Sequence, residues 1–253
     1  MRHPYRHTYI YSKMLKGKPL MRDRQLSRHV PVTEWYHDHT LYKMLAYSPV
    51  LYITPDDGSA GNGVIRVKRL NRYECLVSHR NTSDKCMIHR LASEVRKRMI
   101  PRRKYIIQQG ISLATYKNRP FDLRVVLQKP ADRWLLTWMS AKIAPRTNSI
   151  VTNVAKGARD ARIMPTLRGI DQPLNAAHLM KEVEKLSYRI ADKLGSSFPF
   201  RIIGLDMAID KNGNIWYIEA NTNPNFHGLE KLDPVQYRRY MMIKRQMKAR
   251  KLI

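Results

Sequence analysis

Two carboxylates and an amide in the segment RIIGLDMAIDKNGNIWYIEANTN have the types and spacing to hold a metal ion. Two apolar runs meet there at the Asn-Gly pair 212–213, which predicts a β-hairpin with a two-residue turn. That turn places Asp206 directly opposite Glu219, with Asn221 on the same face as Glu219. Like charges opposite each other require a compensating cation, and oxygen ligands suit magnesium that also binds phosphate oxygens. We therefore expect Asp206, Glu219 and Asn221 to be metal ligands.

The register of this hairpin decides whether the metal site exists. The two-residue turn also places Met207 opposite Ile218 and Ile209 opposite Trp216. A slip by one residue would separate the two carboxylates, because neighbouring side chains of a strand point to opposite faces. The alternative interpretation is a solvent-exposed acidic pair flanked by lysines and arginines.

A second candidate site is the segment LYITPDDGSAGNGVIRVKR, which has the pattern of a strand, a glycine-rich loop and another strand. Gly58, Gly61 and Gly63 leave the backbone free to curl, as in loops that cradle phosphate groups. The strand before the loop carries Thr54, where a nucleotide-binding loop would use a lysine. The segment therefore predicts a phosphate-binding loop from which one charge is absent.

Apolar spacing predicts the helices around these two segments. Residues 40–47 are expected to form a short helix, and a longer one is expected to begin at Asp84 and end at Pro101. The apolar face of the longer helix would consist of residues four apart: Met87, Leu91, Val95 and Met99. The clearest helix covers 174–195, and Gly195 is expected to end it.

Strand patterns occupy the middle of the chain and predict a mostly antiparallel sheet. The segments with this pattern are 105–110, 121–128, 134–144 and 149–155. Residues 1–33 are basic and expected to be irregular, whereas 233–253 are expected to form a basic helix.

The composition narrows the class of protein. The chain has 253 residues, 43% of them hydrophobic, which suffices for the core of one large domain or of two lobes. Its net charge of +27 indicates an anionic partner, with nucleic acid among the candidates, or otherwise a solubilising bias. The two cysteines cannot form a disulfide framework, and no apolar run has the length of a signal peptide or a membrane span. We expect a soluble cytoplasmic protein.

Four ordered blocks of the sequence resemble the ATP-grasp superfamily, and more closely its YheC/YheD type, named for association with the endospore coat. The blocks are YITPDDGSAGNGVIRV, YIIQQGISLATYKNRPFDLRVVLQK, SIVTNVAKG and IIGLDMAIDKNGNIWYIEANTNP. Their order is also similar to that of RimK-type glutamate ligases. The resemblance implies an α+β fold in which two lobes with mainly antiparallel sheets grip ATP. The implied parts are a basic N-terminal segment, 1–33, a small lobe, 34–107, a large lobe, 108–232, and a basic C-terminal helix, 233–253.

The resemblance also implies roles for individual residues. Those matched to ATP binding are Gly58, Ser59, Gly61, Gly63, Gln108, Gln109, Gly110 and Asp122, and Lys68 is expected to bind ATP as a substitute for the missing strand lysine. Arg124 would stabilise charge during phosphoryl transfer, and Asn153 would lie at the phosphate and substrate end of the site. Asp206, Glu219 and Asn221 match the magnesium ligands, in agreement with the hairpin register.

The implied reaction consumes ATP with Mg²⁺ and activates a carboxylate as an acyl-phosphate, which an amine-type nucleophile then attacks. Thr54 departs from the resemblance, because the family usually has a lysine there; Lys43, Arg66 or Lys68 could substitute for it. For Arg124, the alternative role is an ion pair with Asp122 on one strand face.

Three functions follow as hypotheses. The first is a ligase acting on an acidic or peptide-like acceptor that the basic surface attracts. The second is a kinase-like transfer of phosphate to a hydroxyl group. The third is a catalytically degenerate ATP-grasp protein that acts as a basic polyanion-binding or spore-coat scaffold, which Thr54 favours and the intact set of metal ligands disfavours.

Overall fold

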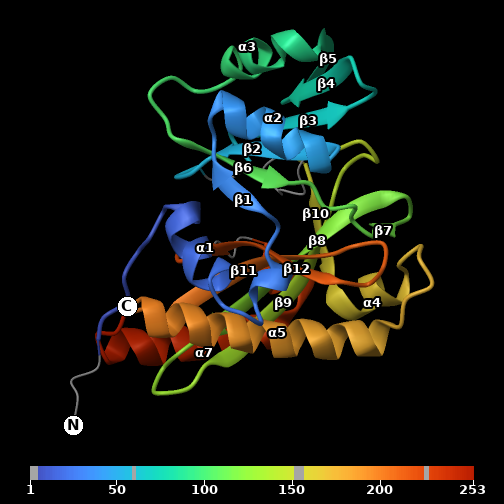
Figure 1. Cartoon of the computed structure of the whole chain (residues 1–253). Coiled ribbons are helices and arrows are strands. Elements are labelled where there is room, and N and C mark those ends of the chain that lie inside the picture. Colours follow the sequence, from blue (N-terminus) through green and yellow to red (C-terminus); the bar gives the residue numbers. More distant parts are fainter. Residues whose placement is uncertain (1–4, 59–60, 151–156, 225–227) are drawn as a thin grey trace.

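The computed structural model of the chain describes residues 5–58, 61–150, 157–224 and 228–253. Its strands form two antiparallel sheets, each covered by helices, in two lobes that lie one above the other (Figure 1). The expected α+β fold with mainly antiparallel sheets is therefore confirmed. Within the described ranges, no helix is long and apolar enough to cross a membrane.

The sheet of the small lobe has six strands and positions the glycine-rich loop. Its order is β1 (Thr33–Trp35), β6 (Tyr105–Gln109), β2 (Val50–Pro55), β3 (Ile65–Arg69), β4 (Glu74–His79) and β5 (Thr82–Met87). Leu51 and Ile53 of β2 are fully buried in the core that this sheet shares with α2 (Asp38–Tyr47) and α3 (Leu91–Arg96). The alternate residues, Tyr52 and Thr54, therefore face the other lobe.

The helix expected from Asp84 to Pro101 is wrong at both ends, because α3 covers only Leu91–Arg96. Residues Thr82–Met87 form the edge strand β5, in which Asp84 lies opposite Val77 of β4, and the short 3₁₀ helix η2 (Ile88–Arg90) leads into α3. Met87 is 44% exposed, so it takes no part in the core that its spacing suggested. Strand pairing with β4 thus outweighed the helical spacing at this edge of the sheet.

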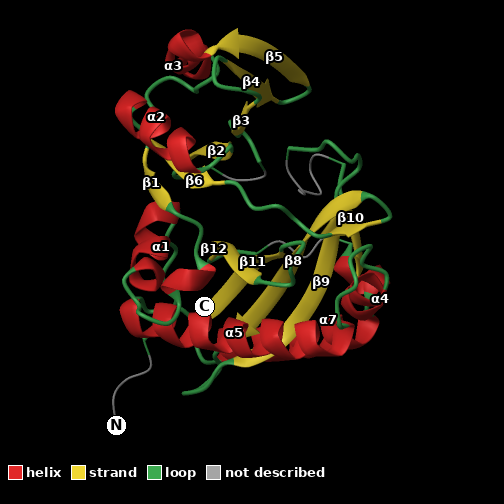
Figure 2. Ribbon diagram, turned by 45° about the vertical axis from the view of Figure 1, so that its right-hand side comes forward, coloured by secondary structure: helices red, strands yellow, loops and turns green. Residues whose placement is uncertain are grey.

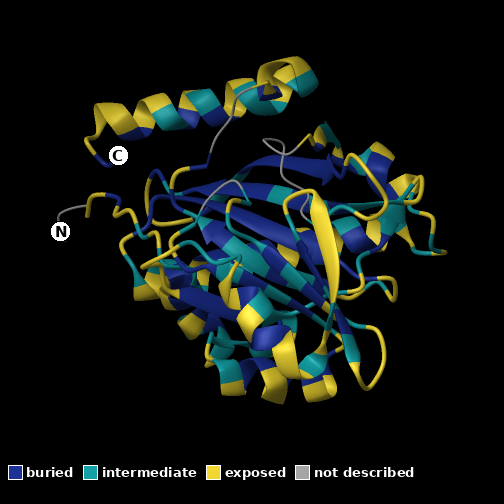
Figure 3. Cartoon of the chain, turned by 90° about the horizontal axis from the view of Figure 1, so that it is seen from above, coloured by how far each residue is buried: buried dark blue, intermediate teal, exposed yellow. Residues whose placement is uncertain are grey.

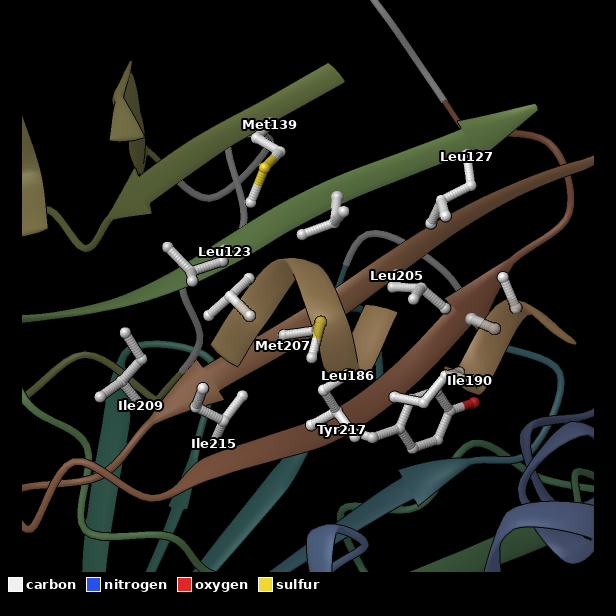
Figure 4. Close-up of a cluster of buried hydrophobic side chains, with 14 of the residues drawn as sticks. Leu123, Leu127, Met139, Leu186, Ile190, Leu205, Met207, Ile209, Ile215 and Tyr217 are labelled. Atoms are coloured by element: carbon white, nitrogen blue, oxygen red, sulfur yellow. The ribbon is translucent and has the colours of Figure 1, made fainter. Parts of the chain in front are cut away.

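The large lobe also has a six-stranded sheet, and one of its faces packs on a long helix (Figure 2). Five strands follow the order β10 (Arg159–Arg162), β9 (Leu135–Ile143), β8 (Arg119–Gln128), β11 (Ile202–Ile209) and β12 (Ile215–Asn221), and β7 (Thr115–Tyr116) pairs with β8. Leu186 and Ile190 of α5 (Ala176–Ser197) pack with Leu205 and Met207 of β11 (Figure 4). The short helix α4 (Ile163–Arg168) contacts the same core.

The expected C-terminal stop of α5 at Gly195 is wrong, because the helix continues to Ser197 and Phe198 caps it. A Cβ atom at Gly195 would lie 3.0 Å from the indole of Trp134. This glycine therefore allows close packing of the helix. The expected strands at 105–110, 121–128 and 134–144 are confirmed as β6, β8 and β9, whereas most of 149–155 lies outside the described residues.

The other face of the large sheet is apolar at one end and polar at the other. At the apolar end, Val126 of β8 lies opposite Trp138 of β9, and both are buried with Tyr240 and Ile243 of α7 (Pro234–Ala249). The short helix α6 (Leu229–Leu232) precedes α7, whose outer side is largely exposed beside the C label in Figure 3. Because α7 covers only this end, the polar end of the face is left for a site between the lobes.

The first 33 residues were expected to be irregular, but they contain α1 (Lys13–Met21), the 3₁₀ helix η1 (Ser27–His29) and the start of β1. The Ser12 hydroxyl accepts a hydrogen bond from the backbone N–H of Leu15 and caps α1. Gly17 and Pro19 inside α1 are helix-breaking residues, which explains why the sequence did not predict it. The helix packs against both α5 and β12 of the large lobe.

Candidate active site

The β11–β12 hairpin brings Asp206 and Glu219 opposite each other, although its turn differs from the expected one. The backbone of Asp210 pairs with Asn214, so the turn has three residues, and Gly213 takes the left-handed conformation with φ of 84°. A β-bulge after Asp206 then inserts one extra residue in β12 and restores the expected register. The predicted pair of carboxylates is therefore confirmed.

The outer half of the hairpin has a different register from the one expected. Met207 pairs with Tyr217 instead of Ile218, and Ile209 pairs with Ile215 instead of Trp216. The physical reason is the three-residue turn, which shifts every pair between the turn and the bulge by one position.

The Asp210 carboxylate fixes this turn by accepting four hydrogen bonds. Oδ1 accepts from the backbone N–H groups of Asn212 and Asn214, both at 2.9 Å. Oδ2 accepts from the Asn214 side-chain amide at 3.0 Å and from the Trp216 indole at 2.9 Å. Burial alone would raise the pKa of Asp210, but these hydrogen bonds outweigh it and lower the pKa below its usual value. The ionised carboxylate therefore stabilises the hairpin that carries the candidate site.

Asp206 is the centre of a buried network of charges. Arg124, its cross-strand neighbour on β8, donates from Nε to Oδ1 at 2.6 Å and from Nη2 to Oδ2 at 3.1 Å. Lys142 of β9 donates to the same Oδ1 at 3.0 Å. Burial alone would raise the pKa of Asp206, but the two cations outweigh it and lower the pKa to about 2. Asp206 is therefore held as a carboxylate.

Lys142 joins this network to the predicted nucleotide residue Asp122. The two residues lie directly opposite each other on β9 and β8, with 3.0 Å between Nζ and Oδ1. Burial alone would lower the pKa of Lys142, but the carboxylates of Asp122 and Asp206 outweigh it and raise the pKa. The sequence signal for Lys142 was a single lysine in an otherwise uncharged strand, and our sequence analysis missed it.

The third predicted metal ligand, Asn221, bridges the other two. Its amide nitrogen donates to Asp206 Oδ2 at 3.2 Å and to Glu219 Oε1 at 3.3 Å. If the side-chain amide of Asn221 rotates so that its oxygen and nitrogen exchange places, its carbonyl oxygen faces the two carboxylates. The three residues then present oxygen ligands around one position. Such a set fits magnesium, which takes its remaining ligands from water and phosphate. The described residues contain no group of three or more His, Cys, Asp or Glu that could hold a metal ion.

A cavity of about 460 Å³ lies between the two lobes, and many of the predicted site residues line it. The predicted residues in its wall are Gly58, Gly61, Gln108, Gln109, Asp122, Asp206 and Glu219. The predicted residues outside its wall are Gly63, Lys68, Gly110, Arg124 and Asn221, of which the last two contact Asp206. Ser59 and Asn153 lie outside the described residues.

Two of the predicted glycines allow close packing. Gly63 has φ of 74°, and a Cβ atom there would lie 2.8 Å from the ring of Pro55. A Cβ atom at Gly110 would lie 2.6 Å from Val50 Cγ1, and the Gly110 N–H donates to the Val50 carbonyl oxygen at 2.8 Å. Both glycines therefore allow the backbone beside the cavity to pack closely against β2.

The proposed substitutes for a strand lysine lie in different places. Arg66 lines the cavity, whereas Lys68 is exposed outside its wall and Lys43 pairs with Glu34 on the surface at 3.1 Å. Thr54 also lines the cavity, and its buried hydroxyl has no hydrogen-bond partner among the described residues. Lys13 of α1 lines the cavity as well, and no pattern in the sequence pointed to it because its segment was expected to be irregular.

Two lobes with antiparallel sheets enclose the cavity, and solved structures of ATP-grasp ligases have a similar fold. VanG D-Ala:D-Ser ligase from Enterococcus faecalis matches with a TM-score of 0.58 and 13% identity, covering 95% of this chain and 61% of that one. D-cycloserine synthetase DcsG matches with a TM-score of 0.53 and 14% identity, covering 93% of this chain and 70% of that one. At such identities these matches establish the fold.

The sequence comparison specifies the family. The profile of YheC/D-like ATP-grasp proteins matches residues 4–248, so the chain belongs to that family. Endospore coat-associated protein YheD of Bacillus subtilis (strain 168) is 29% identical over an alignment of 189 residues, and the match covers 71% of this chain and 40% of that protein. The chain thus spans less than half the length of this relative.

Proposed function

We propose that the protein is an ATP- and magnesium-dependent ligase that activates a carboxylate as an acyl-phosphate for attack by an amine-type nucleophile. The observation that carries this proposal is the convergence of Asp206, Glu219 and Asn221 at a cavity between the two lobes of an ATP-grasp fold. Family membership supports the use of ATP.

In the proposed complex, the adenine lies beside Gln108 and Gln109 at the end of β6, where both residues line the cavity. The phosphates then extend beneath the loop that contains Gly58 and Gly61, towards the three metal ligands. Tyr52 and Ile218 also line the cavity and add apolar surface from the two lobes.

Bound magnesium would neutralise charge on the β and γ phosphates and assist transfer to the acceptor carboxylate. Arg124 lies outside the cavity wall and forms a bidentate pair with Asp206, so we assign it the role of orienting that ligand. Lys142 lines the cavity between Asp122 and Asp206, and its ammonium group is placed to stabilise negative charge on the reacting phosphate. Closure of the two lobes would exclude water from the acyl-phosphate.

The acceptor is proposed to be anionic or peptide-like. The net charge of +27 favours an anionic molecule, and it leaves nucleic acid as a further candidate partner. A solved structure of the ATP-grasp ligase PsnB, with a TM-score of 0.50 to this chain, is a complex with its precursor peptide PsnA2, which supports a peptide-like acceptor for this chain. Association with the spore coat is proposed from the name of the relative YheD.

Trapping of an acyl-phosphate with hydroxylamine tests this function. The protein would be incubated with ATP, magnesium, hydroxylamine and a panel of amino acids and acidic peptides. A ligase forms ADP and a hydroxamate of one panel member, whereas a kinase forms a stable phosphate ester and no hydroxamate. Magnesium-dependent ATP binding without ATP consumption for any panel member would contradict the ligase proposal.

A degenerate, polyanion-binding protein is the second candidate, and the neutral Thr54 in the cavity wall favours it. Such a protein would bind polyanions with an affinity that falls steeply with salt and is unchanged by Glu219→Gln. Loss of ATP consumption in Glu219→Gln would favour the ligase instead.

A further inference from the structure

Lys13 of α1 reaches the candidate phosphate site from a segment that precedes both sheets. Its ammonium group donates to the carbonyl oxygens of Pro55, at 3.3 Å, and of Gly58, at the start of the glycine-rich loop. The same nitrogen lies 3.5 Å from Glu219 Oε2, and the Lys13 side chain is 17% exposed. Lys13 therefore lies between the loop predicted to cover the phosphates and a predicted metal ligand.

Backbone contacts fix the position of Lys13. Its N–H donates to the Asp56 carbonyl oxygen at 2.9 Å, and the N–H of Met14 donates to Asp56 Oδ1 at 2.8 Å. Both contacts attach the beginning of α1 to the chain between Thr54 and the glycine loop. The direction of the Lys13 side chain thus depends on the same segment that would cover the phosphates.

A lysine at this point of a helix is electrostatically unfavourable. Lys13 is the first residue of α1 after the Ser12 cap, and the first turn contains no acidic residue. The positive end of the helix dipole repels a cation there. The nearby carboxylate of Glu219 and the two carbonyl oxygens compensate for this repulsion.

The other cations in the described wall of the cavity are placed differently. Lys142 is buried between two carboxylates, Lys211 lies in the turn of the β11–β12 hairpin, and Arg66 lies on β3. Thr54, on the strand that leads into the glycine loop, contributes a hydroxyl and no charge. Lys13 is thus the cation of this wall that contacts the backbone of the glycine loop directly.

We propose that Lys13 supplies the phosphate-binding ammonium group that β2 lacks at Thr54. This inference rests on the proposed binding of ATP. Glu219 would hold magnesium together with the phosphates, and Lys13 already contacts that carboxylate, so a phosphate bound there would lie within reach of the Lys13 ammonium group. With Glu219 engaged as a metal ligand, the ammonium group would pair with the phosphate instead. The N-terminal helix is then part of the nucleotide site.

Equilibrium binding of Mg-ATP and of AMP tests this role. Lys13→Met is expected to weaken Mg-ATP binding by about 10- to 100-fold, as expected for a lost charged hydrogen bond, and to change AMP binding little. Lys18→Met, an exposed lysine of the same helix, is the matched control and should leave both affinities unchanged. The double variant Lys13→Met/Thr54→Lys should regain most of the lost affinity, because it returns an ammonium group to the same region of the cavity. Urea unfolding verifies that each variant is folded.

The outcomes separate this inference from the proposed function. Absence of Mg-ATP binding by the folded wild-type protein would contradict the proposed function itself. Wild-type binding that Lys13→Met leaves unchanged would overturn only the inference. Equal weakening of Mg-ATP and AMP, without recovery in the double variant, would identify Lys13 as a structural tether of the loop and would also overturn it.

Discussion

Asp210 provides a stringent test of how the candidate site is positioned, because its carboxylate fixes the turn of the β11–β12 hairpin. Asp210→Asn keeps one acceptor oxygen for the backbone N–H groups of the turn. The other oxygen becomes an NH₂ group that faces two donors, the Trp216 indole and the Asn214 amide. A hydrogen bond to a charged acceptor contributes about 1.5–3 kcal/mol to stability. The hydrogen bond from Asn214 contributes less than this, because Asn214 is exposed and can bind water instead.

We expect Asp210→Asn to lower the free energy of unfolding by about 2–3 kcal/mol at pH 7. For a chain of this size, that loss lowers Tm by roughly 4–12 °C. The effect should depend on pH, because the folded protein lowers the pKa of Asp210. The stabilisation is complete above the unfolded pKa of about 3.9 and is lost as the pH falls further through the folded pKa.

Urea unfolding of the wild-type protein and Asp210→Asn between pH 7 and pH 3 measures this effect. The difference in unfolding free energy between them should be largest at pH 7 and decrease below about pH 4. Asp132→Asn, at an exposed aspartate in the β8–β9 connection, is the control and should change stability by less than about 0.5 kcal/mol. A difference for Asp210→Asn no larger than that of the control, or one independent of pH, would refute the reasoning.

Three further predictions concern packing and charge. Gly110→Ala should lower the free energy of unfolding in urea by about 1–3 kcal/mol, because its Cβ would overlap Val50 of β2. Gly17→Ala is the control: a Cβ atom has room at this position of α1, so the variant should be neutral or more stable by about 0.5–1 kcal/mol. Ile243→Ala should lower the free energy of unfolding by about 2–5 kcal/mol, because Ile243 packs α7 into the core. Met242 is 65% exposed, so Met242→Ala should lower it by less than about 0.5 kcal/mol. Equal effects of the two variants would contradict the docking of α7. Lys142→Met should lower the free energy of unfolding by about 1.5–3 kcal/mol at pH 7, because it removes a charged hydrogen bond to the buried carboxylate of Asp206 while Arg124 still pairs with it, and a neutral result would contradict the charge network.

The sequence predicted the core of the candidate site because local signals were strong there. An Asn-Gly pair between two apolar runs specified the β11–β12 hairpin, and Asp206 does lie opposite Glu219. The prediction was right for a partly wrong reason: a three-residue turn and a β-bulge each shift the register by one position, and the two shifts cancel. Neither feature has a signal in the sequence that separates it from a two-residue turn.

Tertiary contacts explain what the sequence did not predict. The residues from Asp84 to Met87 were expected to begin a helix, but pairing with β4 makes them part of a strand. Helix α1 contains Gly17 and Pro19 and forms where it can pack against α5 and β12. Lys13 and Lys142 reach the cavity only through such contacts, one from α1 and one from the register between β8 and β9.

The most direct test of the account is calorimetric titration of the protein with ATP in the presence and absence of magnesium. We predict binding by the wild-type protein that requires magnesium and is lost in Glu219→Gln, since this carboxylate lines the cavity beside Asn221. Glu184→Gln, at an exposed position of α5, should bind as the wild type does. Magnesium-independent binding, or binding that Glu219→Gln leaves unchanged, would contradict the assignment of this cavity as an ATP–magnesium site.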